Sequence, residues 1–234
     1  MLQPISVTLY DIFGYLVPGA VTVLAIVIAA WTATAPRATL QLIPQPTQLW
    51  VAAAFVAYIA GHVVQAIANE LRRLTRSAES KVLTGAGVAV IPKCLADAVR
   101  QKLGARLGVP PDALPPACVC AACDETVVQR GMTDDRQMYV YREGFYRGMT
   151  VACLMLSLSI IARAFAPAGA VRVASMVQPM GWGQWALLAG LSAGASYFMF
   201  VRYQRFAIYR VTRAILGFLA LDMKHDTPPG KGGL

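Results

Sequence analysis

Four long, mostly apolar runs constrain this chain more than any other feature of its sequence. They cover residues 12–31, 49–68, 148–166 and 182–201. A helix needs roughly 20 such residues to cross the ~30 Å hydrocarbon core of a bilayer. The chain is 57% hydrophobic and only 14% charged, which is more apolar surface than a soluble core can use. We therefore predict an all-α integral membrane protein with four transmembrane helices.

The positions of the arginines predict which loops lie in the cytoplasm, because loops rich in Lys and Arg stay on that side. Arginines flank the insert between spans two and three and follow span four, whereas the loops at 32–48 and 167–181 carry only Arg37 and Arg172. Arg163, near the end of span three, is expected to extend to the interface. The insert and both termini are therefore predicted to be cytoplasmic. The tryptophans fall at the opposite ends of the spans, at Trp31, Trp50, Trp182 and Trp185.

The chain divides into four segments on this basis. Residues 1–68 and 148–201 form two transmembrane hairpins, 69–147 form a cytosolic helical insert, and 202–234 form a basic tail. Within the insert, Pro92 and Gly108 suit the start and end of one helix. Its apolar stripe consists of Leu95, Val99, Leu103 and Leu107. Such a stripe indicates a local core or, as an alternative, a groove for a cytosolic partner protein.

Prolines and charges mark the rest of the insert and the tail. Four prolines between residues 110 and 116 predict an irregular stretch, and Asp134 can begin a helix that runs into span three. On the tail, four arginines share one helix face, and the opposite face is apolar. The arginines are Arg202, Arg205, Arg210 and Arg213. This helix can lie on lipid headgroups or pack under the bundle. The net charge of +9 thus favours the lipid bilayer over nucleic acid as a partner.

A polar stripe near the cytosolic ends of spans one and two is the leading candidate site. Span two carries Tyr58, His62, Gln65 and Asn69 at helical spacing, and span one carries Asp11 and Tyr15. Ionisable groups at this depth are costly unless they are paired or wetted, so they mark candidate functional positions. The structural alternative is that Asp11 caps span one and His62 forms a hydrogen bond within the bundle.

Small residues predict close helix contacts in spans one and four. Pro18 lacks the N–H that would bond the carbonyl of Gly14, so Gly14, Pro18 and Gly19 indicate a kink or a close contact. Gly190 and Gly194 are four residues apart, as are Ala189 and Ala193 and also Ser192 and Ser196. Small residues at this spacing let two helices approach closely. The contact can lie within one chain or between two copies.

Cysteines in the insert raise the question of a metal site. Cys94, Cys118, Cys120 and Cys123 could together bind a tetrahedral zinc ion. Their spacing lacks the paired C-x-x-C pattern of zinc knuckles, so free thiols in a reducing cytosol are the simpler interpretation. We expect no cofactor.

Three short motifs carry a resemblance to known proteins. They are Asp11-Ile-Phe-Gly-Tyr-Leu-Val-Pro-Gly19 in span one, Tyr58-Ile-Ala-Gly-His62 in span two, and Tyr141-Arg-Glu-Gly-Phe-Tyr-Arg147 at the entry to span three. Together they resemble uncharacterised four-span proteins of the bacterial inner membrane, some of which are similar to membrane effectors of anti-phage systems. The resemblance implies the bacterial inner membrane as location and brings no catalytic residues.

These observations favour a non-enzymatic function. We expect a self-associating membrane protein that acts as a regulated pore or membrane-perturbing effector, with the insert controlling it. The alternative is a scaffold that anchors a cytosolic protein on the leucine stripe of the insert. An intramembrane enzyme using Asp11 and His62 is disfavoured, because no nucleophile or second carboxylate joins them at matching depth.

Overall fold

The computed structural model describes most of the chain. The described residues are 3–34, 40–42, 47–74, 82–83, 91–131, 134–166, 170–173, 176–179 and 181–225. They belong to two compact units, each made of two separate stretches of sequence. Unit 1 consists of Met1–Arg73 and Tyr141–Tyr203, and unit 2 consists of Leu74–Val140 and Gln204–Leu234.

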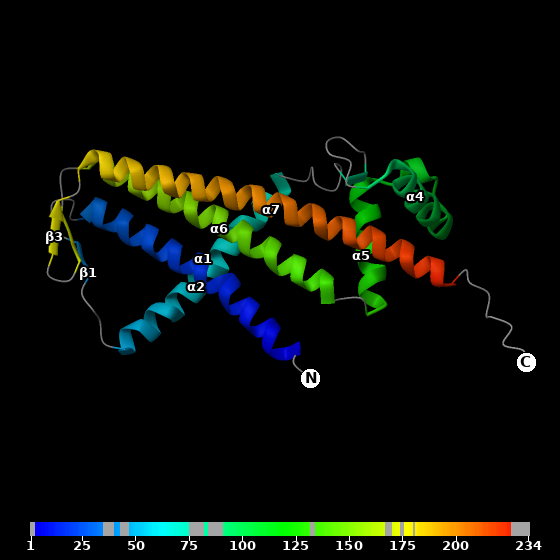
Figure 1. Ribbon diagram of the computed structural model, residues 1–234, viewed down its shortest axis with the longest axis horizontal. Helices are drawn as coiled ribbons and strands as arrows, with labels where there is room; N and C mark the ends of the chain where they lie inside the picture. Colours follow the sequence, from blue (N-terminus) through cyan, green and yellow to red (C-terminus); the bar gives the residue numbers. More distant parts are fainter. Residues whose placement is uncertain are drawn as a thin grey trace, which may run out of the picture. The chain divides into compact units, whose positions relative to one another are not determined.

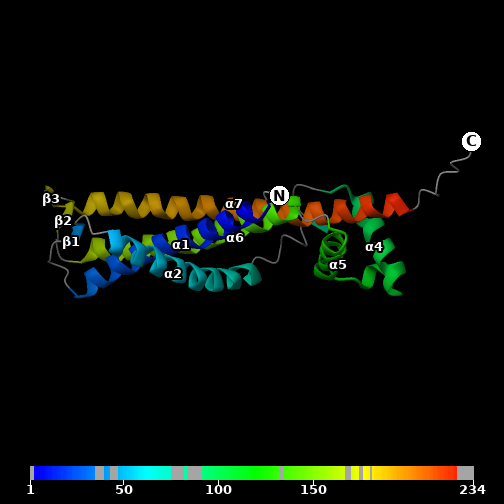
Figure 2. The same cartoon turned by 90° about the horizontal axis from the view of Figure 1, so that it is seen from below.

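Four long helices provide the frame of unit 1. They are α1 (Gln3–Thr34), α2 (Thr47–Leu74), α6 (Asp134–Phe165) and α7 (Trp182–His225), of which α6 contributes from Tyr141 and α7 as far as Tyr203. In Figures 1 and 2, α6 and α7 run side by side, and Figure 1 shows α2 crossing α1.

Each of these helices contains a segment long and apolar enough to cross a membrane. The segments are Ile12–Ala33, Leu49–Glu70, Gln137–Phe165 and Trp182–Leu221. The prediction of four apolar helices of membrane-spanning length is confirmed. The third segment begins earlier than the predicted residue 148, because the helix continues without a break through Arg142 and Arg147.

Three short strands form a small sheet in the described part of unit 1. They are β1 (Leu40–Leu42), β2 (Ala170–Val173) and β3 (Met176–Pro179), and they pair in the order β1-β2-β3. Leu40 pairs with Val171 in the parallel ladder, and Ala170 pairs with Pro179 in the antiparallel one. The sequence analysis treated these segments as loops. The sheet brings the two loops together at one end of the bundle, which we call the sheet end.

Many large apolar side chains are exposed on the helices of unit 1. Large exposed side chains include Phe55 on α2, 65% exposed, and Leu187 on α7, 63% exposed. A soluble protein buries such side chains, whereas lipid tails solvate them. The exposure therefore agrees with helices whose outer faces contact lipid.

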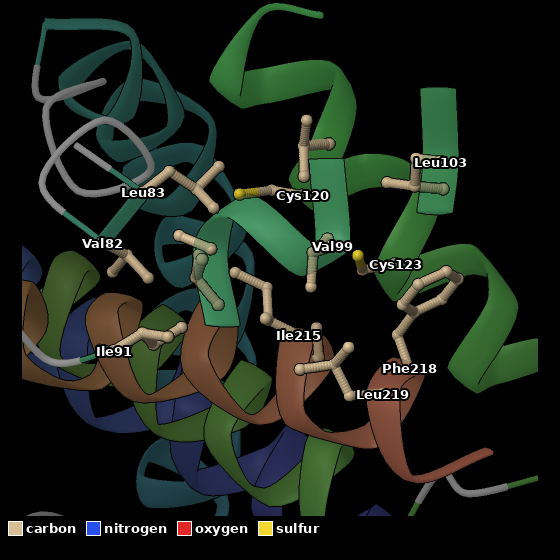
Figure 3. Close-up of a cluster of buried hydrophobic side chains, with 14 residues drawn as sticks. Val82, Leu83, Ile91, Val99, Leu103, Cys120, Cys123, Ile215, Phe218 and Leu219 are labelled. Atoms are coloured by element: carbon tan, nitrogen blue, oxygen red, sulfur yellow. The ribbon is translucent and has the colours of Figure 1, made fainter. Parts of the chain in front are cut away.

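Unit 2 has its own hydrophobic core. Around it lie α4 (Lys93–Leu107), the 3-10 turn η1 (Pro111–Ala113), α5 (Pro116–Gln129) and the part of α7 after Tyr203. Figure 3 shows Val99 and Leu103 from α4, Cys120 and Cys123 from α5, and Ile215 and Phe218 from α7 in one cluster. The insert and the tail thus form one unit rather than two separate segments.

The ends of α4 agree with the prediction from the sequence. Pro92 precedes the helix, and Gly108 ends it in the left-handed conformation with φ of 66°. Three residues of the predicted stripe, Leu95, Val99 and Leu103, pack in or against the core. Leu107, by contrast, is 57% exposed, because the last turn of the helix extends past the core.

Helix α5 was missed in the sequence analysis. The prolines at 110–116 predicted irregular structure, but proline is well tolerated in the first turn of a helix, where its missing N–H is not needed. Pro116 begins α5 in this way, and Pro115 precedes it. The predicted helix from Asp134 into span three is present as α6.

Candidate functional site

The crossing of α1 and α2 depends on two glycines. A Cβ atom added to Gly19 would collide with the backbone of Ala57, and one added to Gly61 would collide with the backbone of Tyr15. The two helices therefore touch backbone to backbone, as small residues allow. The sequence pattern indicated Gly19 as a packing residue, whereas Gly61 stood only within the motif at 58–62.

An aromatic cluster lies beside this crossing. The ring of His62 stacks on that of Tyr15, with centroids 4.0 Å apart and planes inclined by 17°. Tyr58 meets the same imidazole edge-on at 4.7 Å. Three residues of the predicted polar stripe are therefore in mutual contact. His62 is nevertheless exposed at the surface of the unit, so the two tyrosines cover only part of its ring.

Gln65 joins three helices at the same level. Its Nε2 amide donates hydrogen bonds to the carbonyl of Gly14 on α1, at 3.3 Å, and to that of Gly144 on α6, at 2.9 Å. The Gly14 carbonyl needs a donor because Pro18, four residues later, has no N–H. Pro18 thus leaves a carbonyl without its helical donor, and the half-buried amide of Gln65 supplies one.

Gly148 makes room for that amide. A Cβ atom at this position would lie 2.5 Å from Nε2 of Gln65. Pro18 itself is fully buried, and its carbonyl accepts a hydrogen bond from Thr22 at 2.9 Å. A polar side chain, a proline and a glycine on three different helices therefore depend on one another.

The other two members of the predicted stripe stand apart from this contact. Asn69 is exposed on α2. Asp11 falls within α1, but its side chain lies outside the described residues. The proposed meeting of Asp11 with the stripe therefore stays a prediction.

A cavity adjoins Gln65 and opens at the surface of unit 1. Its volume is about 280 Å³. The lining comes from α1 and α6 and consists of Phe13, Gly14, Tyr141, Arg142, Phe145 and Tyr146. All six residues belong to the sequence motifs at 11–19 and 141–147, although the sequence alone did not indicate a cavity.

A buried arginine lies near the sheet end, where the sequence analysis expected an interfacial one. Arg163 is 2% exposed, and its guanidinium carbon lies 4.1 Å from the ring centre of Trp31 and 5.9 Å from that of Trp185. A cation over indole rings is stabilised by their electron-rich faces. The expectation that Arg163 extends to the interface is therefore wrong.

The tryptophans themselves divide into two pairs. Trp31 and Trp185 are each 7% exposed and pack at 6.2 Å, whereas Trp50 and Trp182 are exposed by 64% and 66%. All four were expected at the membrane interface. Arg163, Trp31 and Trp185 all lie near helix ends that face the same side in the predicted topology. This shared level was the signal that could have predicted the cluster.

Helices α6 and α7 are joined by serines, of which Ser192 and Ser196 belong to the predicted set of small residues, whereas the two glycines of that set take no part. Ser157, Ser192 and Ser196 each donate a hydrogen bond to a backbone carbonyl of the opposite helix, at 2.8–3.1 Å. Gly190 and Gly194 are exposed, and a Cβ atom at either would meet nothing within 4 Å. The predicted G-x-x-x-G pair thus lies on the outer surface of α7.

The cysteines of unit 2 do not converge on a point. Cys120 and Cys123 are buried in the core, while Cys94 and Cys118 are exposed. Among the described residues, no group of three or more His, Cys, Asp or Glu side chains is arranged to hold a metal ion. The zinc hypothesis for these four cysteines therefore has no support in their geometry.

Cys123 behaves as a core residue. Burial, with smaller contributions from Cys120 and Asp124, raises the pKa of its thiol to about 12. A thiol of this kind stays protonated and is a poor nucleophile and metal ligand. Its role is packing.

The tail arginines occupy different environments. Arg202, Arg205 and Arg213 are exposed, and Nε of Arg205 donates to the hydroxyl of Tyr209 at 3.0 Å. Arg210 forms an ion pair with Asp124 of α5 at 4.0 Å. The apolar face opposite them is buried in the core of unit 2, so it is not available for insertion into headgroups.

Comparison with known proteins adds no family. No protein-family model, no curated protein sequence and no solved structure matches this chain.

Proposed function

We propose that this chain is a non-enzymatic membrane protein whose copies associate through the outer face of α2 and form a regulated pore or membrane-perturbing assembly. One observation carries the proposal, namely the exposure of the His62 ring beside large exposed apolar side chains of the same helix. Phe55 and Ile59 lie on the same face, at 65% and 49% exposure. Spacings of four and three residues place them in line with His62.

An imidazole facing lipid tails is energetically unfavourable. A second copy of the chain that covered this face would remove the imidazole from lipid, or several copies would gather their histidines around a wetted path. Either arrangement gives the exposed ring a partner without changing the contacts of Tyr15 and Tyr58.

The scaffold alternative loses its docking face. That hypothesis relied on the stripe from Leu95 to Leu107, but Val99 and Leu103 are 0% and 4% exposed in the core of unit 2. A partner protein would need a different surface. In the pore hypothesis, unit 2 is instead the compact cytosolic part that regulates the assembly.

The test combines membrane leak with oligomeric state. Bacteria expressing the full chain are loaded with a membrane-potential dye, and wild type is compared with His62→Ala and Asp11→Asn at matched membrane levels. Val51→Ala, which alters another exposed residue of the same helix (67% exposed), serves as control. We expect depolarisation by wild type and Val51→Ala, and none by His62→Ala or Asp11→Asn.

The same proteins are then sized by mass photometry in detergent. Wild type is expected as an oligomer. Equal depolarisation by wild type and His62→Ala would exclude the proposed path, and a monomeric wild type that leaves the potential unchanged would exclude the proposal as a whole.

A further inference from the structure

We propose that the cavity between α1 and α6 is a binding site for the anionic headgroup of a phospholipid. The proposal goes beyond a pore or effector function. The cavity lies within a single copy of the chain, so lipid binding does not depend on whether copies form a pore. It stands on the chemistry of the lining, the position of the cavity along the helices and the way its walls are held.

The lining combines one cation with aromatic rings. Arg142 supplies the only formal charge among the six lining residues, while Phe13, Phe145 and the two tyrosines supply ring surface and two hydroxyl groups. The neighbouring carboxylate of Glu143 is buried and pairs with Arg147 at 3.7 Å, so it is not part of the lining. The guanidinium of Arg142, an exposed side chain, suits a phosphate, and the mostly apolar remainder of the lining suits the glycerol and first acyl carbons.

The cavity lies where headgroups are expected. Phe13 is the second residue of the first membrane-spanning segment, which begins at Ile12, and Tyr141–Tyr146 fall in the first third of the segment Gln137–Phe165. Tyr and Arg side chains at the end of a span are typical of the headgroup level. Basic pockets between transmembrane helices at this level are suited to anionic lipid headgroups.

The walls of the cavity are held in place by Gln65. Its amide bonds the carbonyl of Gly14 on one wall and that of Gly144 on the other helix. Gly14 also leaves the cavity open, because a Cβ atom there would meet nothing within 4 Å. The space is thus built by a fixed backbone geometry and by a missing side chain.

The test is direct lipid binding to the full chain purified in an uncharged detergent. Short-chain phosphatidylglycerol is titrated by calorimetry, with phosphatidylcholine of the same chain length and inorganic phosphate in parallel. We expect phosphatidylglycerol to bind about tenfold more tightly than phosphatidylcholine, because the choline cation of the latter neutralises its headgroup and repels the guanidinium of Arg142. Tighter binding of free phosphate than of phosphatidylglycerol would assign the site to a soluble anion and overturn the lipid proposal.

Three variants locate the binding. Arg142→Ala is expected to abolish the preference for phosphatidylglycerol, and Gly14→Leu, which puts a side chain into the cavity, to abolish binding of both lipids. Arg202→Ala removes an exposed arginine of unit 1 outside the cavity, over the ring of Phe198, and is expected to bind as wild type does.

Equal losses in Arg142→Ala and Arg202→Ala would show unspecific surface charge and overturn the proposal, as would unchanged binding in Gly14→Leu. The calorimetric measurement does not depend on leak. A protein that binds phosphatidylglycerol but leaves the membrane potential unchanged would therefore contradict the pore and support the lipid site.

Discussion

At the scale of single residues, the polar groups of unit 1 have specific structural partners. Gln65 bonds the carbonyl that Pro18 leaves without a helical donor, at 3.3 Å, and a carbonyl of α6 at 2.9 Å. A buried carbonyl without a donor costs free energy comparable to a lost hydrogen bond. Gln65 is therefore a stabilising residue, whatever role its neighbour His62 has.

Replacing Gln65 tests this account. Gln65→Leu should lower the free energy of unfolding by about 1–3 kcal/mol, because two carbonyls lose a donor. Asn69→Leu, one turn further along the same helix and exposed, should change stability little. Thermal unfolding of the detergent-purified protein measures both.

The reason for the loss can be tested in the same assay. Pro18→Ala restores the N–H that bonds the Gly14 carbonyl. Gln65→Leu should therefore cost less in the Pro18→Ala background than in wild type. Equal costs in the two backgrounds would show that Gln65 stabilises the protein by other contacts.

At the scale of the helices, glycines act in two opposite ways. Gly19 and Gly61 lie at a backbone-to-backbone crossing, whereas Gly190 faces open space. Serine hydrogen bonds connect α6 and α7 instead. The same residue type is thus a packing element in α1 and α2 and a surface element in α7.

Substitution by alanine separates these roles. Gly19→Ala and Gly61→Ala should each destabilise the protein by about 1–3 kcal/mol or more, because the added methyl group forces the two backbones apart. Gly190→Ala should be neutral or stabilise by up to about 1 kcal/mol through higher helix propensity. Melting temperatures measure the difference. A destabilising Gly190→Ala would mean that this face is covered, as a contact with a second copy would require.

At the scale of the whole molecule, the insert and the tail depend on each other. Unit 2 is assembled from Leu74–Val140 and Gln204–Leu234, and its core takes side chains from both. Phe218 is 1% exposed in that core and packs under the guanidinium of Arg106 at 5.2 Å. The core of the insert is thus completed by side chains of the tail, which residues 141–203 separate from the insert in the sequence.

A change in the tail should therefore unfold the insert. Phe218→Asp is expected to make α4 and α5 sensitive to trypsin, because an unpaired carboxylate cannot stay in an apolar core. Leu216→Asp, two residues earlier and 40% exposed, is the matched control and should leave the insert resistant. Cleavage sites are identified by mass spectrometry. Resistance of Phe218→Asp would show that the insert folds without the tail.

Local patterns in the sequence determined much of the fold. Four apolar runs predicted the four long helices, since length and hydropathy depend only on neighbouring residues. Pro92 and Gly108 likewise predicted the ends of α4 through their backbone preferences. Pro18 predicted a carbonyl without a donor, and the helical spacing of Tyr58 and His62 predicted one polar face.

Only the tertiary structure decided which residues meet. Contacts between separate helices determine that Gln65 donates to the carbonyl of Gly14 and that Gly61 lies at the crossing. They also place the guanidinium of Arg163 near the rings of Trp31 and Trp185. The apolar stripe of α4 was visible in the sequence, but the choice between a local core and a partner groove depended on the tail that covers it. The physical reason is that a helix determines the direction of its own side chains, whereas the partner of each side chain depends on the packing of the other helices.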